Sequence, residues 1–400
     1  MNINFKSTFH GIGQGLFYSL IVNEHVIVYD CGSETNMPPR HNILNTYING
    51  AMINEYFKDG KIDLFIISHF HNDHINGIKK LHSKGIDIRE FVMPYLYKEI
   101  RWLFWGGKTT NDFDFINDPV GYLKGLYPQC KITFIKNSTD LDNDDFINAN
   151  ESGDDDNKPF DIMGWYGNTI EKDEWQDDLS VIFQTSLSSY RIPYWKFKFS
   201  QDSFPDKINI SKIRKAIKDS KIDIGNDPSK ILDVIDIMKQ NMPSNLRNET
   251  SLICCHGPVA HKNNIYIYFE IIISKEKRYT QFSCCSHIHN ENVSNLDLGI
   301  PLFHLLSGDA EISDRFRYED NFMNDLGKVL VFQIPHHGSA ENWHNWFVHS
   351  HPNTKFWLYS RGDPNRFNHP TAHFPTIVNK NKIDLIQGKK FELEGFIHLS

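Results

Sequence analysis

Residues 66–77 read Ile-Ile-Ser-His-Phe-His-Asn-Asp-His-Ile-Asn-Gly, and this stretch decides how the rest of the chain is interpreted. The apolar run at residues 64–67 predicts a buried strand that ends in a loop. Four side chains of metal-binding type follow it within six residues: His69, His71, Asp73 and His74. Imidazole with carboxylate suits zinc, manganese or iron. A solvated histidine-rich turn is the alternative, but packing alone has no use for such a cluster.

The composition bounds the class of protein. Four hundred residues with 40% apolar content suffice for a large core in one elaborated domain or two. The formal net charge of −8 does not favour nucleic-acid binding, although a local basic groove is compatible with it. The six cysteines form no Cys-x-x-Cys motif, which is typical of reduced thiols in the cytoplasm. The start of the chain resembles no signal peptide, and no window approaches the roughly 20 apolar residues of a membrane helix. We therefore expect a soluble, cytoplasmic protein with no membrane contact.

More ligand-type residues follow far downstream. Residues 305–309 read Leu-Leu-Ser-Gly-Asp, an expected strand ending in a carboxylate. Residues 329–334 predict another buried strand, which leads into Pro-His-His-Gly-Ser at residues 335–339. After an expected strand at residues 356–360 comes Asn-Arg-Phe-Asn-His-Pro-Thr at residues 365–371. The ligand-type residues here are Asp309, His336, His337 and His369.

Four motifs in this order resemble the metallo-β-lactamase fold, a superfamily of mono- and dinuclear metallohydrolases. They are the Gly-Ile-Gly-Gln-Gly turn at residues 11–15, the His-x-His-x-Asp-His loop, the Pro-His-His-Gly-Ser segment and the Asn-Arg-x-x-His-Pro segment. The first, third and fourth are similar to the branch around the competence protein ComEC. The turn is no phosphate-binding loop, because Leu16 and Phe17 stand where Lys and Ser or Thr are needed. The resemblance implies an α/β fold, the αβ/βα four-layer sandwich, here with inserted segments.

The resemblance also implies a dinuclear site with zinc or manganese. His69 and His71 would hold one metal ion, Asp73 and His74 would hold the second, and Asp309 would bridge the two.

Further roles follow from the same resemblance. Asp30 would support the ligand loop from outside the ligand set, although a turn or cap residue is an equal explanation on chemistry alone. Either His336 or His337 would supply the third histidine of the first metal, and the other would face the substrate. We assign the metal to His336 and catalysis to His337, and we expect His369 to complete the second metal site.

The predicted chemistry is phosphodiester hydrolysis by a metal-activated water. Asp73 would orient or deprotonate this water, and His337 would protonate the leaving oxygen. The ComEC-like resemblance points to a nuclease acting on single-stranded DNA or RNA. One alternative is a small-molecule hydrolase for a lactone, thioester or cyclic nucleotide, which the negative charge favours. Another is a non-catalytic metal-containing interaction protein, against which the open ligand set argues.

Three segments are expected: half-domains at residues 1–135 and 248–400, and an insertion at residues 136–247. Between residues 140 and 178 the insertion carries fourteen acidic residues, which predicts a surface or partly disordered segment and a site for a protein partner. Residues 140–151 match the spacing of a calcium loop but lack its glycine.

The later part of the insertion is basic and aromatic. Trp195, Lys196 and Lys198 are candidates for single-stranded nucleic-acid contact through stacking and phosphate pairing. Their alternation describes a half-buried strand equally well. Ser339, Asn365 and Arg366 are further candidate substrate contacts by resemblance. Four more histidines are possible ligands, each more consistent with a loop residue: His256, His261, His287 and His289.

Overall fold

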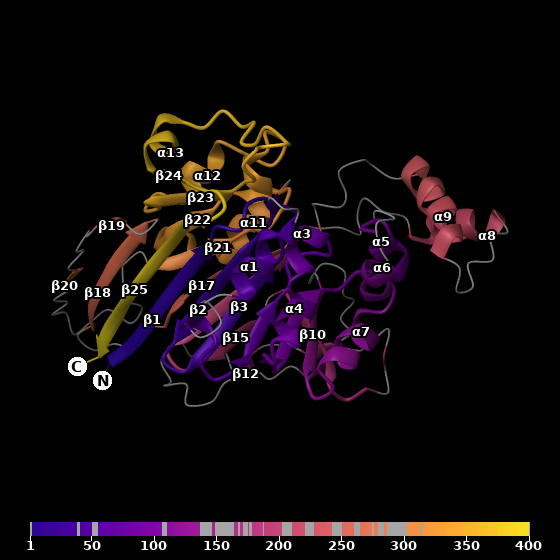
Figure 1. Ribbon diagram of the computed structural model, residues 1–400, viewed down its shortest axis with the longest axis horizontal. Helices are drawn as coiled ribbons and strands as arrows, with labels where there is room; N and C mark the ends of the chain where they lie inside the picture. The colour runs from indigo at the N-terminus through magenta and orange to yellow at the C-terminus, as the bar shows by residue number, and fades with distance from the viewer. Residues whose placement is uncertain are drawn as a thin grey trace.

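Two β-sheets face each other, and helices cover the outer side of each. The computed structural model has three buried apolar clusters that mark the layers. One cluster lies between the two sheets, one between the first sheet and its helices, and one between the second sheet and its helices. The result is an α/β arrangement with two mixed sheets, as predicted for the four-layer sandwich (Figure 1).

The description covers the following residues: 2–37, 41–49, 55–105, 110–136, 146–148, 164–166, 169–170, 175, 178–186, 188–201, 210–220, 228–241, 250–259, 265–273, 276–278, 284–285, 302–312 and 314–399. Most of the acidic stretch, including nearly all of the calcium-loop spacing, lies outside these residues, as do His261, His287 and His289. Within them, no helix has the length and apolar character needed to cross a membrane.

The first sheet has thirteen strands among the described residues. In spatial order they are β11 (Phe146–Asn148), β13 (Thr169–Ile170), β14 (Val181–Thr185), β10 (Lys131–Lys136), β9 (Glu90–Pro94), β7 (Leu64–Ile66), β3 (His25–Cys31), β2 (Phe17–Val22), β1 (Asn2–His10), β25 (Lys390–Leu399), β18 (Ile265–Ile273) and β19 (Glu276–Arg278), with β20 (Cys284–Cys285) also on β18. The two ends of the described chain meet here, because β1 and β25 pair along their whole length, with Asn2 opposite His398 (Figure 1).

The second sheet has eight strands among the described residues. Their order is β12 (Gly164–Tyr166), β15 (Ser189–Ile192), β16 (Trp195–Gln201), β17 (Leu252–Pro258), β21 (Phe303–Leu306), β22 (Val329–Gln333), β23 (Phe356–Ser360) and β24 (Lys382–Leu385). The last four strands are parallel, so their carboxyl ends meet at one edge, where open α/β sheets bind ligands. Two short pairs complete the strands: β4 (Asn36–Met37) with β5 (His41–Asn42), and β6 (Lys61–Ile62) with β8 (Asp87–Ile88).

Helices occupy the outer layers. Those before residue 250 are α1 (Ile43–Asn49), α3 (Asn72–Ile75), α4 (Ile78–Ser83), α5 (Lys98–Trp102), α6 (Thr110–Asn117), α7 (Pro119–Leu126), α8 (Ile210–Asp219) and α9 (Pro228–Asn241). Those after it are α11 (Arg315–Phe322), α12 (Trp346–Ser350) and α13 (Thr376–Asn381), with the 3-10 turns η4 (Leu326–Lys328) and η5 (Pro335–Gly338). The helix that follows the ligand loop is interrupted after α3, because the Gly77 N–H bonds to the Cys31 carbonyl at 2.7 Å instead of continuing the helix.

The segment predicted as an insertion contributes to both sheets. Strand β14 pairs with β10 in the first sheet, and β16 pairs with β17 in the second. Residues 181–186 and 188–201 therefore belong to the body of the sandwich.

Candidate metal centre

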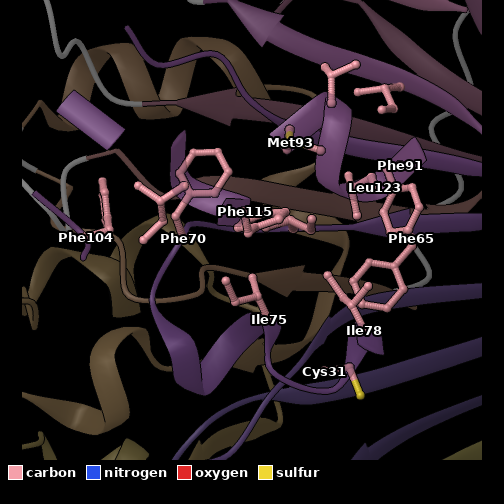
Figure 2. Close-up of a cluster of buried hydrophobic side chains, with 14 of the residues drawn as sticks. Cys31, Phe65, Phe70, Ile75, Ile78, Phe91, Met93, Phe104, Phe115 and Leu123 are labelled. Carbon is pink, nitrogen blue, oxygen red and sulfur yellow. The ribbon is translucent and has the colours of Figure 1, made fainter. Parts of the chain in front are cut away.

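The ligand loop leaves the carboxyl end of β7 and is held from both sides. Below it, Ile75 and Ile78 pack into the apolar cluster shown in Figure 2, where Phe65 and Phe70 also lie. This packing fixes the direction in which the ligand side chains leave the loop.

Gly15 and Gly32 pack against the backbone of the ligand loop on the other side. The Leu16 N–H donates to the Asp73 carbonyl at 3.2 Å. A Cβ on Gly15 would lie 2.6 Å from the Asp73 carbonyl oxygen, and one on Gly32 would lie 2.3 Å from the Asp73 carbonyl carbon. Both distances are too short for a Cβ atom. Gly32 and Gly15, the last residue of the glycine-rich turn at residues 11–15, therefore allow the ligand loop to pack closely against them.

The second sheet supplies the remaining ligands from its carboxyl edge. Asp309 follows β21, and His336 and His337 follow β22. The Gln333 side-chain oxygen accepts the N–H groups of Ser307 (2.7 Å) and Gly308 (2.8 Å), which ties the two strand ends together.

A first cluster forms around one oxygen of Asp309. His69, His71 and Asp309 offer three ligand atoms within 4.8 Å of one another. His69 Nε2 lies 3.7 Å from Asp309 Oδ2, and His336 Nε2 lies 3.9 Å from the same oxygen.

A second cluster forms around the other oxygen. Asp73, His74 and His337 offer three ligand atoms within 4.8 Å of one another. His74 Nε2 lies 3.4 Å and His337 Nε2 3.9 Å from Asp309 Oδ1. The Asp309 carboxylate thus turns one oxygen to each cluster, which is the geometry of a bridging ligand.

Hydrogen bonds on the far side of three rings fix their orientation. Nδ1–H of His74 donates to Asp30 Oδ2 (2.7 Å), that of His336 to Asn342 Oδ1 (2.8 Å), and that of His337 to the Ser360 carbonyl (2.9 Å). Each ring is then in the tautomer that presents Nε2 to Asp309, as metal-ligating histidines require. The structure places Asp30 at the position expected for it, and Ser68 braces it through its N–H and hydroxyl at 2.7 and 2.6 Å. Asn342 and Ser360 carry no sequence signal that would have identified this role.

The buried polar atoms test whether this arrangement fits metal ions. Nε2 of His74 and Nε2 of His337 are buried and make no hydrogen bond within the described part of the chain. His74 Nε2 lies 3.4 Å from Oδ1 of the buried Asp309, and His337 Nε2 lies 3.7 Å from Oδ2 of the partly buried Asp73, both longer than usual hydrogen bonds. Buried unpaired nitrogens opposite carboxylates are costly unless a cation joins them. The residues present therefore fit two metal ions.

The pKa shifts of Asp73 and His69 favour metal binding, whereas that of His74 opposes it. Burial raises the pKa of Asp73, but His74 and His337 outweigh it and hold the pKa below its ordinary value. Burial lowers the pKa of His69 well below its usual range, and His74 adds to this. An ionised carboxylate and a neutral imidazole are the ligand forms. Burial opposes charge on His74, yet Asp309 and Asp30 hold its pKa well above its usual range, so a metal ion there would displace a proton.

The geometry favours other roles for two of the predicted histidines. His337 was expected to be a free catalytic group, but it lies in the second cluster with Asp73 and His74. His369 was expected to complete the second metal site, but it belongs to neither group of three ligand atoms. Its ring centroid lies 5.6 Å from that of His336 and 6.0 Å from that of His337, on the wall of the pocket. His336, assigned to the first metal, also belongs to neither group, but its Nε2 lies 3.9 Å from the Asp309 oxygen of the first cluster.

A pocket of about 320 Å³ opens over both clusters. Its apolar wall includes Phe70 and Phe104, which lie near each other at one end of the cluster in Figure 2. Its polar lining includes Gln14, Glu34, Asn72 and His369. The pocket gives a substrate access to both carboxylates of the centre.

The predicted substrate contacts beside this pocket differ from one another. Ser339 is buried and its N–H donates to the His336 carbonyl at 2.9 Å. Asn365 is occupied by the backbone of His369, whose N–H donates to the Asn365 side-chain oxygen at 3.1 Å. Arg366 is exposed at the rim. Ser339 and Asn365 therefore shape the loops, and Arg366 is accessible to a substrate.

The prediction of nucleic-acid contact by Trp195, Lys196 and Lys198 is corrected by the structure. Trp195 is fully buried between the sheets, where its Nε1–H donates to His256 Nδ1 at 3.1 Å. Lys196 and Lys198 form ion pairs with the buried Asp325 at 3.2 and 3.1 Å. The alternation of this segment describes a strand of the core, and its indole is unavailable for stacking. His256 is likewise a core residue and no metal ligand.

One comparison with known proteins gives a match. Residues 11–168 match the family model of the Metallo-beta-lactamase superfamily, a range that includes the ligand loop and Asp30. A search among curated proteins finds no match.

Proposed function

We propose that the chain is a hydrolase with two divalent metal ions, zinc or manganese, that cleaves phosphodiester bonds in single-stranded DNA or RNA. The match of residues 11–168 to the family model of the Metallo-beta-lactamase superfamily supports this proposal. The observation that carries the proposal is the position of Asp309, whose two carboxylate oxygens face different ligand clusters. Two-metal hydrolases hold their ions about 3.5–4 Å apart, and a shared carboxylate produces this spacing.

The ions would supply positive charge for a phosphoryl oxygen and lower the pKa of an attacking water. The chain's own part is to place carboxylates and imidazoles around one point. Asp73 is oriented toward this point by the Leu16 N–H on its carbonyl and by His337, whose Nε2 lies 3.7 Å from Asp73 Oδ2.

His369 lies on the pocket wall and would donate a hydrogen bond to the substrate, which differs from the protonation of the leaving oxygen first assigned to His337. It is half-buried on the pocket wall, and burial, together with His337 and His336, lowers its pKa to about 4. A neutral ring at this position can donate an N–H to a substrate oxygen. Asn365 holds the backbone of this residue and is a positioning residue.

The rim of the pocket supports a polynucleotide substrate over a small one. Arg366 is exposed and Phe367 is 53% exposed, so a cation and an aromatic ring stand together outside the metal centre. This pair suits a phosphate and a base.

A small-molecule hydrolase is the second candidate. The pocket volume of about 320 Å³ lies at the lower end of the range for small-molecule sites, and its walls include Phe70, Phe104 and Ile116. Cleavage of a cyclic nucleotide, lactone or thioester without cleavage of any polynucleotide would favour this candidate.

The test combines metal content with hydrolysis. We expect about two metal ions per chain and cleavage of single-stranded DNA or RNA after zinc or manganese is returned to chelated protein. Asp309→Asn should lose metal and lower the rate by roughly a hundredfold or more, because the amide cannot bridge two cations. The matched control is Asp320→Asn, on the exposed side of α11.

Two results would contradict the proposal. One is an Asp309→Asn protein with full metal content and full rate. The other is two bound metals with no turnover of any phosphodiester, which would favour the non-catalytic alternative.

A further inference from the structure

A smaller chamber of about 70 Å³ adjoins the main pocket. The two cavities share Gln14, Glu34 and Phe367 in their walls, so they lie on neighbouring sides of these residues. Arg366 and Asp363 complete the outer side of the chamber. A substrate bound at the metal centre would therefore reach it with the neighbouring nucleotide.

We propose that one unpaired nucleotide next to the scissile phosphate binds across the mouth of this chamber, with the base on Phe367, its polar edge toward Gln14, and its phosphate on Arg366. The inference rests on the phosphodiesterase function proposed above. It adds the feature of the substrate that the site recognises.

Gln14 is the polar group aimed into the chamber. It is only 9% exposed and lines both cavities. Its backbone is held on both sides, because its N–H donates to Thr35 Oγ1 (2.7 Å) and its carbonyl accepts from the Glu34 N–H (2.8 Å). A side-chain amide in the wall of both cavities, on a backbone held in place, is suited to a ligand that brings both a donor and an acceptor, as a base edge does.

Phe367 supplies the stacking surface. Its ring is 53% exposed at the mouth of the chamber and lies against His369, with centroids 6.2 Å apart and planes 23° apart. One side of the ring therefore neighbours His369, and about half of the residue remains accessible to a base. Aromatic rings held in this way are the usual platforms for unpaired bases.

The charges fix the orientation of the nucleotide. Glu34 lines the inner side of the chamber and would repel a phosphate from there, whereas the exposed Arg366 stands beside Asp363 at the outer edge. The base must therefore point inward and the phosphate outward. In a duplex the face and edge of the base are already engaged, so this mode selects single strands.

The test measures binding to chelated protein, which separates recognition from hydrolysis. Fluorescent single-stranded homopolymers and a matched duplex are titrated by anisotropy at several salt concentrations. The wild type should bind single strands at least about tenfold more tightly than duplex and should prefer one base. Phe367→Ala should weaken single-strand binding by about tenfold, since stacking contributes a factor of this order, and Phe367→Tyr should restore it. Phe316→Ala, which removes a ring that is 79% exposed on α11, is the control and should bind as the wild type does.

Two further variants test the edge and the phosphate. Gln14→Met keeps the volume of the side chain but removes its amide, so the base preference should disappear. Arg366→Ala should reduce the slope of log affinity against log salt by about one, and Arg366→Lys should keep it. Lys355→Ala, an exposed cation before β23 at the opposite end of the sheet, should leave the slope unchanged.

The outcomes distinguish the inference from the proposed function. Wild-type affinity and base preference in both Phe367→Ala and Gln14→Met would overturn the nucleotide site even if the enzyme cleaves DNA or RNA. Loss of affinity and preference in these variants would support the site even if restored metal produced no cleavage, in which case only the phosphodiesterase function would fall.

Discussion

At the scale of single residues, His336 and His337 have the most demanding backbone. Both have positive φ, 46° and 54°, a region that costs residues with a side chain roughly 1–2 kcal/mol each. The two residues follow the carboxyl end of β22, and this conformation sends one ring to each oxygen of Asp309. This unfavourable backbone conformation allows the two histidine rings to reach different oxygens of Asp309.

This conformation gives a prediction about stability. His336→Ala and His336→Gly both lose the hydrogen bond to Asn342, but only glycine relieves the left-handed strain. We expect the glycine variant to be more stable than the alanine variant by about 1 kcal/mol in urea unfolding of metal-free protein.

The control is the same pair of substitutions at Asp320, inside α11, where the order should reverse because glycine costs a helix about 1 kcal/mol. Equal stabilities of the two His336 variants would show that the backbone there is relaxed.

At the scale of elements, a buried carboxylate joins strand β16 to turn η4. Asp325 is fully buried and receives Lys196, Lys198 and Lys328 at 3.2, 3.1 and 3.3 Å. Burial raises the pKa of Asp325, but the three ammonium groups outweigh it and hold the pKa below its ordinary value.

We predict that Asp325→Asn lowers the free energy of unfolding by about 2 kcal/mol at neutral pH. Three cations would lose their counterion, and the effect stays below that of a fully buried pair because Lys198 and Lys328 are partly exposed. Denaturant unfolding measures it. Asp236→Asn, which breaks an exposed pair with Lys239, should change stability by well under 1 kcal/mol, and equal effects of the two substitutions would refute the buried junction.

The sequence predicts elements best where burial is uniform. Strands such as β7 and β22 are apolar runs with polar ends, so their positions were predictable. The break between α3 and α4 was not, because it depends on the Gly77 N–H finding the Cys31 carbonyl across the fold. The alternation of Trp195, Lys196 and Lys198 was compatible with two roles, and only the position of Asp325 distinguishes them.

Prediction from the sequence is limited in the same way for the residues of the candidate metal centre. Ligand types and their order along the chain identify His69, His71, Asp73, His74 and Asp309 as a group. The roles of His337 and His369 depend on a backbone turn and a loop, and neither follows from spacing. Asn342 and Ser360 act only through distant neighbours, so no local pattern marks them.

At the scale of the whole molecule, buried neutral histidines make stability depend on pH. Burial lowers the pKa of His10 to about 3 and that of His351 to about 4. In the unfolded chain both take up a proton near pH 6.5. Between about pH 6.5 and pH 4 the unfolded state therefore binds more protons, and the free energy of unfolding falls as pH falls.

We expect His351 to account for about 3 kcal/mol of this loss, since its pKa lies some 2.5 units below 6.5. His351→Gln removes this part alone. The variant is expected to be less stable than the wild type at pH 7, because the ring bonds Tyr318 at 2.8 Å, and the difference should narrow toward pH 4. Urea unfolding of both proteins across this range measures it, and parallel curves would contradict the prediction.

Gly15 and Gly32 constrain how the sequence can evolve. Because the Asp73 backbone occupies the space of any side chain at these two positions, a lineage cannot change them one at a time while keeping the ligand loop. Substitutions in the outer helices can be accepted independently of one another. Gly15, Gly32 and the ligand loop lie in three separate segments of the chain, and these must be conserved together.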